Sequence, residues 1–275
     1  MSELRLSEIW VYPIKSLGGI RVTRAYVKEK GLEYDRRWML VDENGMFMTQ
    51  RVLPTMALLK LRIENGELRI VHSSKSMAHS ISLNPSLSSK EEEEVIIWND
   101  TVNAVEVSKE TSAWFSEVLE KKCRLVYFPE QNSRAVDKKF SVNRENVSLA
   151  DGYPFLIIGQ SSLDHLNSKL EVSIPMNRFR PNFVFTGGEP HEEDTWRNFT
   201  IGINHFVGVK PCARCAIPTI NQDTAEKGIE PSRTLALYRK KDNKILFGQN
   251  LVSVDHQSVK EGDLITIQTR SKYEV

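Results

Sequence analysis

The chain of 275 residues can bury a full core and exceeds the usual size of a single domain, so we expect two modest domains. Its 37 basic and 36 acidic side chains leave a formal net charge of +1, which excludes the bulk positive charge that grips nucleic acid or an anionic membrane. Any bound anion must therefore be held by a local cluster of basic residues.

The composition and the N-terminus predict a cytoplasmic location. The first residues, Met1 to Leu6, lack the apolar core of a secretory signal. No stretch approaches the roughly 20 apolar residues of a membrane span. Three cysteines are an odd number, which fits a reducing compartment better than a framework of disulfides.

Short β segments dominate the first half of the chain. They are expected at Ile9–Tyr12, Arg21–Val27, Trp38–Val41, Leu58–Ile63, Leu68–Val71, Val95–Trp98 and Val102–Val107. Apolar and polar residues alternate along them, and turn-forming pairs such as Asn44-Gly45 and Asn65-Gly66 indicate hairpins. The pattern predicts a fold that is mainly β with a few helices.

Two helices are predicted from apolar residues at helical spacing, at Lys109–Lys121 and Ser161–Leu170. The second opens on Ser161-Ser162-Leu163-Asp164, which approximates a capping signal. Between the two helices, residues 129–146 are polar and charged and separate two β-rich halves. We therefore predict an N-terminal domain over residues 1–128 and a C-terminal domain over residues 129–275.

Several catalytic signatures are absent. There is no G-x-G-x-x-G, and Lys15-Ser16 precedes a glycine pair instead of following a glycine-rich phosphate loop. His191-Glu192 lacks the second histidine of a zinc protease helix. We expect the surrounding Glu189, Glu193 and Asp194 to form a solvated acidic turn. The other histidines have no mutual ligand spacing and are expected to be structural.

The segment from Val209 to Ile220 carries two of the three cysteines, Cys212 and Cys215. The third, Cys123, lies far away in the sequence, so this chain alone cannot assemble a four-cysteine metal site. Two interpretations stay open on spacing alone. Cys215 is a metal-ligating thiolate with Cys212 as its neighbour, or both are half-buried thiols of a strand without chemistry.

Five separated segments combine turn or strand-end geometry with residues that bind anions. They are Tyr12-Pro13-Ile14-Lys15-Ser16, Asp35-Arg36-Arg37-Trp38, Asp151-Gly152-Tyr153-Pro154-Phe155, Asn177-Arg178-Phe179-Arg180-Pro181-Asn182, and the cysteine segment followed by Phe247-Gly248-Gln249-Asn250. Each is a weak signal by itself, because a Lys-Ser pair is usually a turn and arginines before a proline usually belong to an edge strand.

In this order the five segments resemble the MOSC family of molybdenum-cofactor proteins, in particular the amidoxime-reducing component and its bacterial relatives. The resemblance covers nearly the whole chain. It implies a β-barrel MOSC domain preceded by an N-terminal MOSC-associated β-barrel domain. The expected cofactor is molybdenum bound to molybdopterin.

The resemblance also implies roles for individual residues. Cys215 matches the thiolate ligand of molybdenum and is the expected catalytic residue, since a soft sulfur donor suits a metal already held by dithiolene sulfurs. The residues expected to hold phosphate and pterin are Lys15, Ser16, Arg36 and Arg180. Further contacts are expected from the loop Gly152, Tyr153 and Pro154, from Cys212 and Arg214 beside the ligand, and from Asn250, where close relatives carry a tyrosine.

The activity implied is the reduction of small N-hydroxylated compounds such as amidoximes, hydroxylamines and N-oxides. Electrons should come from an external flavoprotein, alone or with a small haem or iron–sulfur carrier, because the chain has no dinucleotide fingerprint and too few cysteines for an all-cysteine cluster beside Cys215. Two alternatives stay open: a carrier of cofactor or sulfur without turnover, and a non-catalytic β-barrel binding module with incidental thiols.

Overall fold

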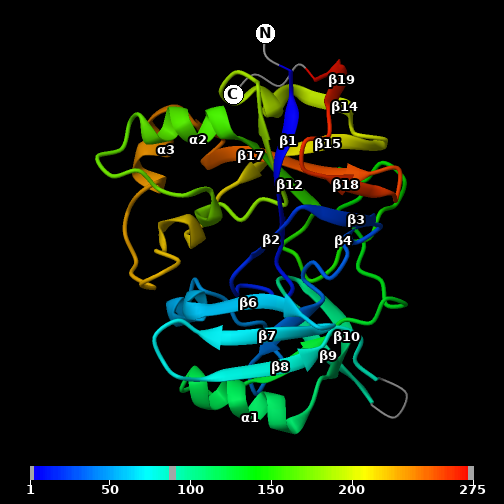
Figure 1. The fold of residues 1–275 in the computed structure, drawn as a ribbon, viewed down its shortest axis with the longest axis vertical. Helices are drawn as coiled ribbons and strands as arrows, with labels where there is room; N and C mark the ends of the chain where they lie inside the picture. The colour runs from blue at the N-terminus through cyan, green and yellow to red at the C-terminus, as the bar shows by residue number, and fades with distance from the viewer. Residues whose placement is uncertain (1–2, 87–90, 272–275) are drawn as a thin grey trace.

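The computed structural model describes residues 3–86 and 91–271, and this part of the chain is mainly β (Figure 1). Its strands are β1 (Arg5–Val11), β2 (Ile20–Val22), β3 (Arg24–Lys28), β4 (Gly31–Leu32), β5 (Trp38–Val41), β6 (Leu59–Glu64), β7 (Glu67–His72), β8 (Ala78–Ser82), β9 (Glu92–Ile97), β10 (Asp100–Glu106), β11 (Arg124–Tyr127), β12 (Phe155–Gly159), β13 (Phe183–Thr186), β14 (Trp196–Ile201), β15 (Asn204–Ala213), β16 (Lys240–Lys241), β17 (Lys244–Ser253), β18 (Ser258–Lys260) and β19 (Ile265–Arg270). The helices are α1 (Lys109–Val118), α2 (Gln160–Asn167) and α3 (Ser232–Tyr238), with short 3-10 turns η1 (Pro54–Leu58), η2 (Met176–Arg178), η3 (Glu192–Thr195) and η4 (Ile217–Thr219). The expectation of a mainly β fold with a few helices is confirmed, although α3 was not predicted.

A nine-stranded sheet forms the larger of two lobes, drawn at the top of Figure 1. Its strands follow the order β19-β14-β15-β17-β12-β13-β1-β2, with β16 paired to β17. The N-terminal strand β1 is antiparallel to β13, and β3 pairs with β18. The first strands of the chain therefore belong to the same lobe as the C-terminal half, and we call it the large-sheet lobe. The predicted division into domains at residue 129 stays a prediction.

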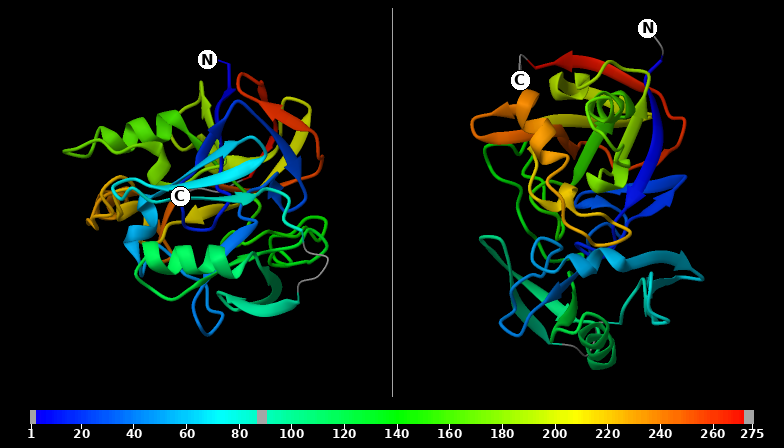
Figure 2. Two further views of the ribbon diagram at one scale, coloured as in Figure 1. Left: turned by 60° about the horizontal axis from the view of Figure 1, so that its bottom comes forward. Right: turned by 90° about the vertical axis from the view of Figure 1, so that its left-hand side faces the viewer.

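The small lobe contains the sheet β5-β11-β10-β9, the meander β6-β7-β8 and helix α1 (Figure 2). Asn65 and Gly66 adopt φ angles of 52° and 78° between β6 and β7, so the hairpin predicted there is confirmed. Helix α1 begins after Ser108, whose hydroxyl accepts a hydrogen bond from the Thr111 backbone N–H. Phe115 on this helix is fully buried against the strands.

The predicted capping signal of α2 is wrong. The helix begins at Gln160 after Gly159, without a side-chain cap, and the hydroxyl of Ser162 donates to the Glu193 carboxylate at 2.9 Å. None of the helices in the described residues is long and apolar enough to cross a membrane.

The expected solvated acidic turn is wrong for Glu193 and Asp194, which are buried, whereas Glu189 is exposed as expected. Asp194 forms an ion pair with the buried guanidinium of Arg239, which arrives from the end of α3. Burial and the neighbouring Asp194 raise the pKa of Glu193 to about 7. We call Ser162, His191, Glu193, Asp194 and Arg239 the η3 cluster. His165 lies beside it, with Nδ1 at 3.1 Å from Nε2 of His191, a pairing that sequence spacing did not indicate.

Candidate functional site

A cavity of about 390 Å³ lies where the two lobes meet. Ten of the eleven predicted site residues line it: Lys15, Ser16, Arg36, Gly152, Tyr153, Arg180, Cys212, Arg214, Cys215 and Asn250. Pro154 does not line the cavity. It is buried directly before β12, with its carbonyl oxygen against Gly31, where an added Cβ would lie only 3.0 Å away.

Four of the cavity residues have left-handed backbone conformations that residues other than glycine rarely adopt. The φ angles are 66° at Ser16, 49° at Arg36, 58° at Trp98 and 56° at Arg180. Each such conformation costs on the order of 1 to 3 kcal/mol and persists only where the surrounding structure enforces it. Their gathering around one cavity makes this region the candidate functional site.

Arg36 is fixed by a carboxylate and by an aromatic ring. Its Nη1 donates to Asp35 at 2.7 Å and to the side chain of Asn182 at 3.2 Å, and its Nη2 donates to the Arg180 carbonyl at 3.3 Å. The guanidinium carbon lies 4.4 Å from the centroid of the Tyr12 ring. Asp35 is fully buried and also accepts a hydrogen bond from the backbone N–H of Tyr12 at 2.8 Å. It therefore links the backbone directly after β1 to Arg36.

Arg180 lacks such a carboxylate. Its Nη1 donates to the Leu17 carbonyl at 2.7 Å, and its guanidinium carbon lies 4.3 Å from the Tyr12 centroid. Within the part of the chain that the structure describes, no acidic side chain forms an ion pair with it. Burial lowers the pKa of this guanidinium to about 10. A buried cation without a counter-ion favours an anionic ligand.

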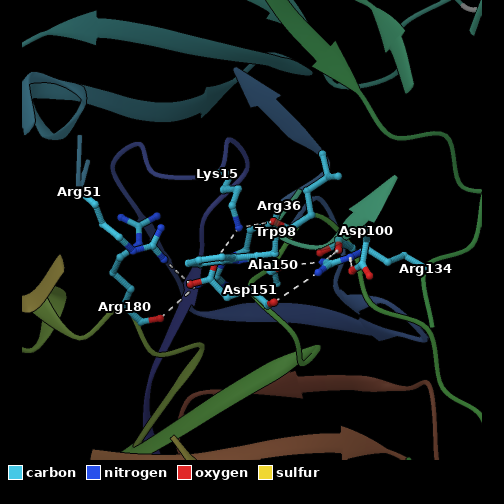
Figure 3. A network of polar contacts seen from close by, with 11 residues as sticks. Lys15, Arg36, Arg51, Trp98, Asp100, Arg134, Ala150, Asp151 and Arg180 are labelled. Carbon is cyan, nitrogen blue, oxygen red and sulfur yellow. Dashed lines mark hydrogen bonds and ion pairs between the residues drawn. The ribbon is translucent and has the colours of Figure 1, made fainter. Parts of the chain in front are cut away.

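Asp151 is shared between two basic side chains and an indole (Figure 3). Its carboxylate accepts Lys15 Nζ at 2.6 Å, Arg51 Nη2 at 3.0 Å and Trp98 Nε1 at 3.3 Å. The Arg51 guanidinium also stacks on Trp98, 4.5 Å from its centroid. Desolvation lowers the pKa of Lys15 to about 8, although Asp151 opposes this shift.

Sequence reasoning missed Asp151, Arg51 and Trp98 as cavity residues. Trp98 was expected at the end of a strand, but β9 ends one residue earlier and Trp98 sits in the turn with a φ of 58°. Its exposed fraction of 44% is high for a tryptophan. Trp98 directly precedes Asn99 and Asp100, two residue types that favour turns, and this was the sequence signal that could have placed it in a turn.

Arg134 holds the loop that carries Asp151. Its guanidinium donates to the carbonyl oxygens of Ser148, Ala150 and Asp151 at 3.0, 2.6 and 3.3 Å, and it pairs with Asp100 at 2.7 Å (Figure 3). The loop backbone is thus fixed by a side chain that does not itself line the cavity. Gly152 and Tyr153, which follow in the chain, are presented to the cavity.

The two cysteines of the site differ in their surroundings. Cys212 is half-buried in β15, and Arg214 Nη1 lies 3.1 Å from its sulfur. Cys215 follows the strand end and is exposed. Arg214 Nη2 donates to the Phe179 carbonyl at 2.6 Å, which holds this segment against the loop that carries Arg180. Of the two thiols, Cys215 is the more exposed.

The charges that line the cavity are strongly unbalanced. Among the described residues the lining has six basic side chains, Lys15, Arg36, Arg51, Arg180, Lys210 and Arg214, against the single carboxylate of Asp151. No group of three or more histidine, cysteine or acidic side chains in residues 3–86 and 91–271 is arranged to hold a metal ion. The cavity therefore suits a ligand that brings negative charge and most of its own metal ligands, and that takes a soft donor from a thiol.

The geometry describes a β protein with an anion-binding cavity and exposed cysteine at the junction of two lobes. Residues 3–122 match the MOSC N-terminal beta barrel domain, and residues 144–266 match the MOSC domain. The chain belongs to the family of MOSC-domain proteins that includes the mitochondrial amidoxime-reducing components.

Relatives of two kinds cover most of this chain. It is 30% identical to mitochondrial amidoxime-reducing component 1 of Mus musculus, over 94% of this chain and 80% of the relative. It is 29% identical to the molybdenum cofactor sulfurase of Oryza sativa subsp. japonica, over 98% of this chain. The chain spans only 35% of that sulfurase. The solved structure of the YUAD protein from Bacillus subtilis covers 96% of the chain with 9% identity and a TM-score of 0.41.

Proposed function

We propose that this chain is a molybdenum-cofactor-dependent reductase of small N-hydroxylated compounds that works in the cytoplasm with an external electron donor. The family and the relatives named for the molybdenum cofactor point to binding of that cofactor. The finer assignment to amidoximes, hydroxylamines and N-oxides follows the amidoxime-reducing relatives.

The cavity fits the cofactor in charge and in donor chemistry. Arg180 and Arg36 would hold the phosphate through charge-assisted hydrogen bonds, with Lys15 and Ser16 beside them. Cys215 would supply the thiolate ligand of molybdenum, because it is the exposed thiol of the cavity. Gly152 and Tyr153 would line the cofactor through the loop that Arg134 fixes.

The protein itself would bind and orient the reactants. When bound, the cofactor supplies the two-electron redox chemistry. Asn250 uses its Nδ2 to donate to the Lys210 carbonyl at 3.1 Å, which leaves its amide oxygen to accept an N–H or O–H of a substrate in the cavity. Arg214 would fix the position of Cys212 beside the ligand. The observation that carries the proposal is that the exposed thiol of Cys215 shares one cavity with the buried guanidinium of Arg180, which has no ion pair among the described residues.

The proposed reaction takes its electrons from a separate donor protein. The chain has three cysteines, too few for an all-cysteine iron–sulfur cluster beside Cys215, and no dinucleotide fingerprint. We propose a flavoprotein as donor, alone or with a small haem or iron–sulfur carrier. Such a contact is brief and is expected to be small and polar.

The test starts with protein purified from a host that makes the molybdenum cofactor. Molybdenum and pterin should be present in equal amounts, and the protein should reduce benzamidoxime to benzamidine with reduced methyl viologen. NADH alone should give no turnover. Cofactor-loaded protein that leaves amidoximes, hydroxylamines and N-oxides unchanged would contradict the proposed activity.

The similarity to the plant sulfurase over nearly the whole chain favours one second candidate, a carrier of cofactor or sulfur. A carrier would release its cofactor to an apo-enzyme without reducing any N-hydroxylated compound. Transfer of radiolabelled molybdenum cofactor between proteins, measured beside the viologen assay, separates the two functions.

A further inference from the structure

We propose that Tyr12 is a positioning residue whose aromatic ring holds Arg36 and Arg180 ready for the phosphate of the ligand while leaving their charges free. The inference rests on the proposed function only in taking that phosphate to belong to the molybdenum cofactor. Free inorganic phosphate presents the same chemistry to the two arginines.

The contacts around Tyr12 carry the argument. Both guanidinium carbons lie over its ring, Arg36 at 4.4 Å and Arg180 at 4.3 Å from the centroid. The two arginines also touch each other, since Arg36 Nη2 donates to the Arg180 carbonyl at 3.3 Å. Two cations in such proximity repel each other, so something must keep both side chains in place before the ligand binds.

An aromatic ring does this in a way that a carboxylate does not. A carboxylate neutralises a guanidinium and occupies its N–H donors, as Asp35 does in part for Arg36. The face of an aromatic ring attracts a cation without accepting its hydrogen bonds. Arg180 therefore keeps most of its donors although it is buried. Tyr12 fixes the arginines and preserves their affinity for an anion.

The ring and not the hydroxyl of Tyr12 performs this role. The hydroxyl is buried and makes no hydrogen bond within residues 3–86 and 91–271. Tyr12 does not line the cavity, so its hydroxyl does not face a ligand there. Gly19 packs over the ring near Cε1, where an added Cβ would lie 2.5 Å from Cε1, 2.9 Å from Cδ1 and 3.1 Å from Cζ of Tyr12. The absence of a side chain at Gly19 therefore leaves room for the ring that contacts the two guanidinium groups.

The experiment measures binding of inorganic phosphate to cofactor-free protein by calorimetry at low salt, together with unfolding by urea. Tyr12→Leu should weaken phosphate binding by about tenfold or more, because it removes two cation–π contacts. Tyr12→Phe should bind like the wild type and should be at least as stable, since it removes only an unpaired buried hydroxyl. Gly19→Ala should weaken binding by displacing the ring.

The matched control is Tyr26→Leu. Tyr26 is exposed and also carries a cation over its ring, Lys28 at 5.6 Å, but it lies outside the cavity. This control should leave phosphate binding unchanged. In an Arg180→Ala background, Tyr12→Leu should cost less phosphate affinity than in the wild type, because it acts through that arginine.

Several results would overturn the inference. They are wild-type phosphate affinity in folded Tyr12→Leu, a loss in Tyr12→Phe as large as in Tyr12→Leu, and no phosphate binding by the wild type. Protein from a cofactor-making host adds the second source of phosphate, and molybdenum content should follow the same order of variants. Phosphate binding that obeys this order in a protein that reduces no amidoxime would refute the proposed activity and leave the role of Tyr12 intact.

Discussion

The cavity and the η3 cluster both bury arginine, but they treat its charge differently. In the η3 cluster Arg239 is paired with the buried carboxylate of Asp194, and its Nε donates to the Leu246 carbonyl at 3.1 Å. In the cavity Arg180 has a carbonyl and an aromatic ring but no carboxylate partner among the residues that the structure describes. Strand β17 serves both regions, with Gln249 next to Asp194 and Asn250 lining the cavity.

The comparison distinguishes a buried arginine that is neutralised within the fold, Arg239, from a buried arginine whose charge is available to a ligand, Arg180. A buried ion pair is satisfied within the chain, and losing one partner leaves the other unpaired at a high cost. An uncompensated buried cation reduces the stability of the free protein, and the binding of an anion removes that penalty. The two regions should therefore respond to substitution in opposite ways.

The largest effect is expected at the thiol of the cavity. Cys215→Ser should lower the rate of viologen-driven amidoxime reduction by more than about 100-fold and strip molybdenum from the purified protein, because a hydroxyl is a poor replacement for a soft thiolate. The urea unfolding curve should change little, since Cys215 is exposed. Metal analysis and kinetics on the same preparation measure both quantities.

Cys212→Ser is the paired control and should be much milder. Equal losses of activity from both substitutions would indicate a dithiol mechanism and contradict the assignment of Cys215 as the sole ligand.

In the η3 cluster the effect should fall on stability. Arg239→Ala should lower the free energy of unfolding by about 3 to 5 kcal/mol, because it leaves the Asp194 carboxylate buried without its cation. Arg233→Ala, on the same helix but in an exposed pair with Glu230, should change stability little. Urea unfolding of cofactor-free protein tests this. A small loss in Arg239→Ala with a large loss of phosphate binding would erase the distinction between the regions.

Arg180→Ala should give the reverse pattern. Cofactor occupancy and phosphate affinity should fall by about 10- to 100-fold, since a charged donor to phosphate contributes about 1.5 to 3 kcal/mol. The cofactor-free protein should be no less stable than the wild type, because an uncompensated buried cation is removed. Arg180→Lys should restore part of the affinity, as a point charge replaces a bidentate fork. Unchanged occupancy with easier unfolding would make Arg180 structural.

Local signals in the sequence were sufficient for several elements. Trp38–Val41 was predicted with the bounds that β5 has, and the Asn65-Gly66 hairpin follows from turn chemistry. Helix α1 was predicted to within a few residues from apolar residues at helical spacing. The predicted residues that line the cavity come from the five motifs whose order resembles that of the MOSC family. Each motif ends a strand or forms a turn, which is where side chains reach a shared cavity.

Long-range pairing is what the sequence did not reveal. Asp151 meets Arg51 across 100 positions, and Asp194 meets Arg239 across 45. A run of acidic residues predicts a solvated turn unless a distant arginine that pairs with it is known. Glu193 and Asp194 were therefore predicted to be exposed, although they are buried. Trp98 was not predicted as a cavity residue for the same reason, because its contacts are with Arg51 and Asp151, which are distant in the sequence.

The pH dependence of the free energy of unfolding should show the effect of burying the Glu193 carboxyl in the η3 cluster. The folded pKa of Glu193 is about 7, above its ordinary value of 4.5, so the folded state holds a proton that the unfolded chain releases between these values. The stabilisation is present below pH 4.5 and is lost as pH rises to about 7, by up to about 3 kcal/mol. Glu193→Gln should flatten this part of the profile, measured by urea unfolding from pH 4.5 to 8. An unchanged slope in the variant would assign the titration to another group.

The pKa of Lys15 is shifted in the opposite direction, and its effect should appear in ligand binding instead of stability. The pKa of Lys15 in the folded protein is about 8, so the cavity holds this positive charge below pH 8 and loses it above pH 8. In the unfolded chain the same side chain stays protonated up to its ordinary pKa of 10.5. Binding of sulfate, whose own charge is constant over this range, should weaken by about tenfold between pH 7 and 9.5 as one charged donor disappears. Lys15→Arg should bind sulfate almost independently of pH, because arginine stays charged. Lys28→Arg, on the exposed face of β3, should keep the wild-type profile. Sulfate affinity that falls equally in Lys15→Arg would place the titrating group elsewhere in the cavity, whereas a flat profile in that variant alone would make Lys15 a titratable part of the anion site.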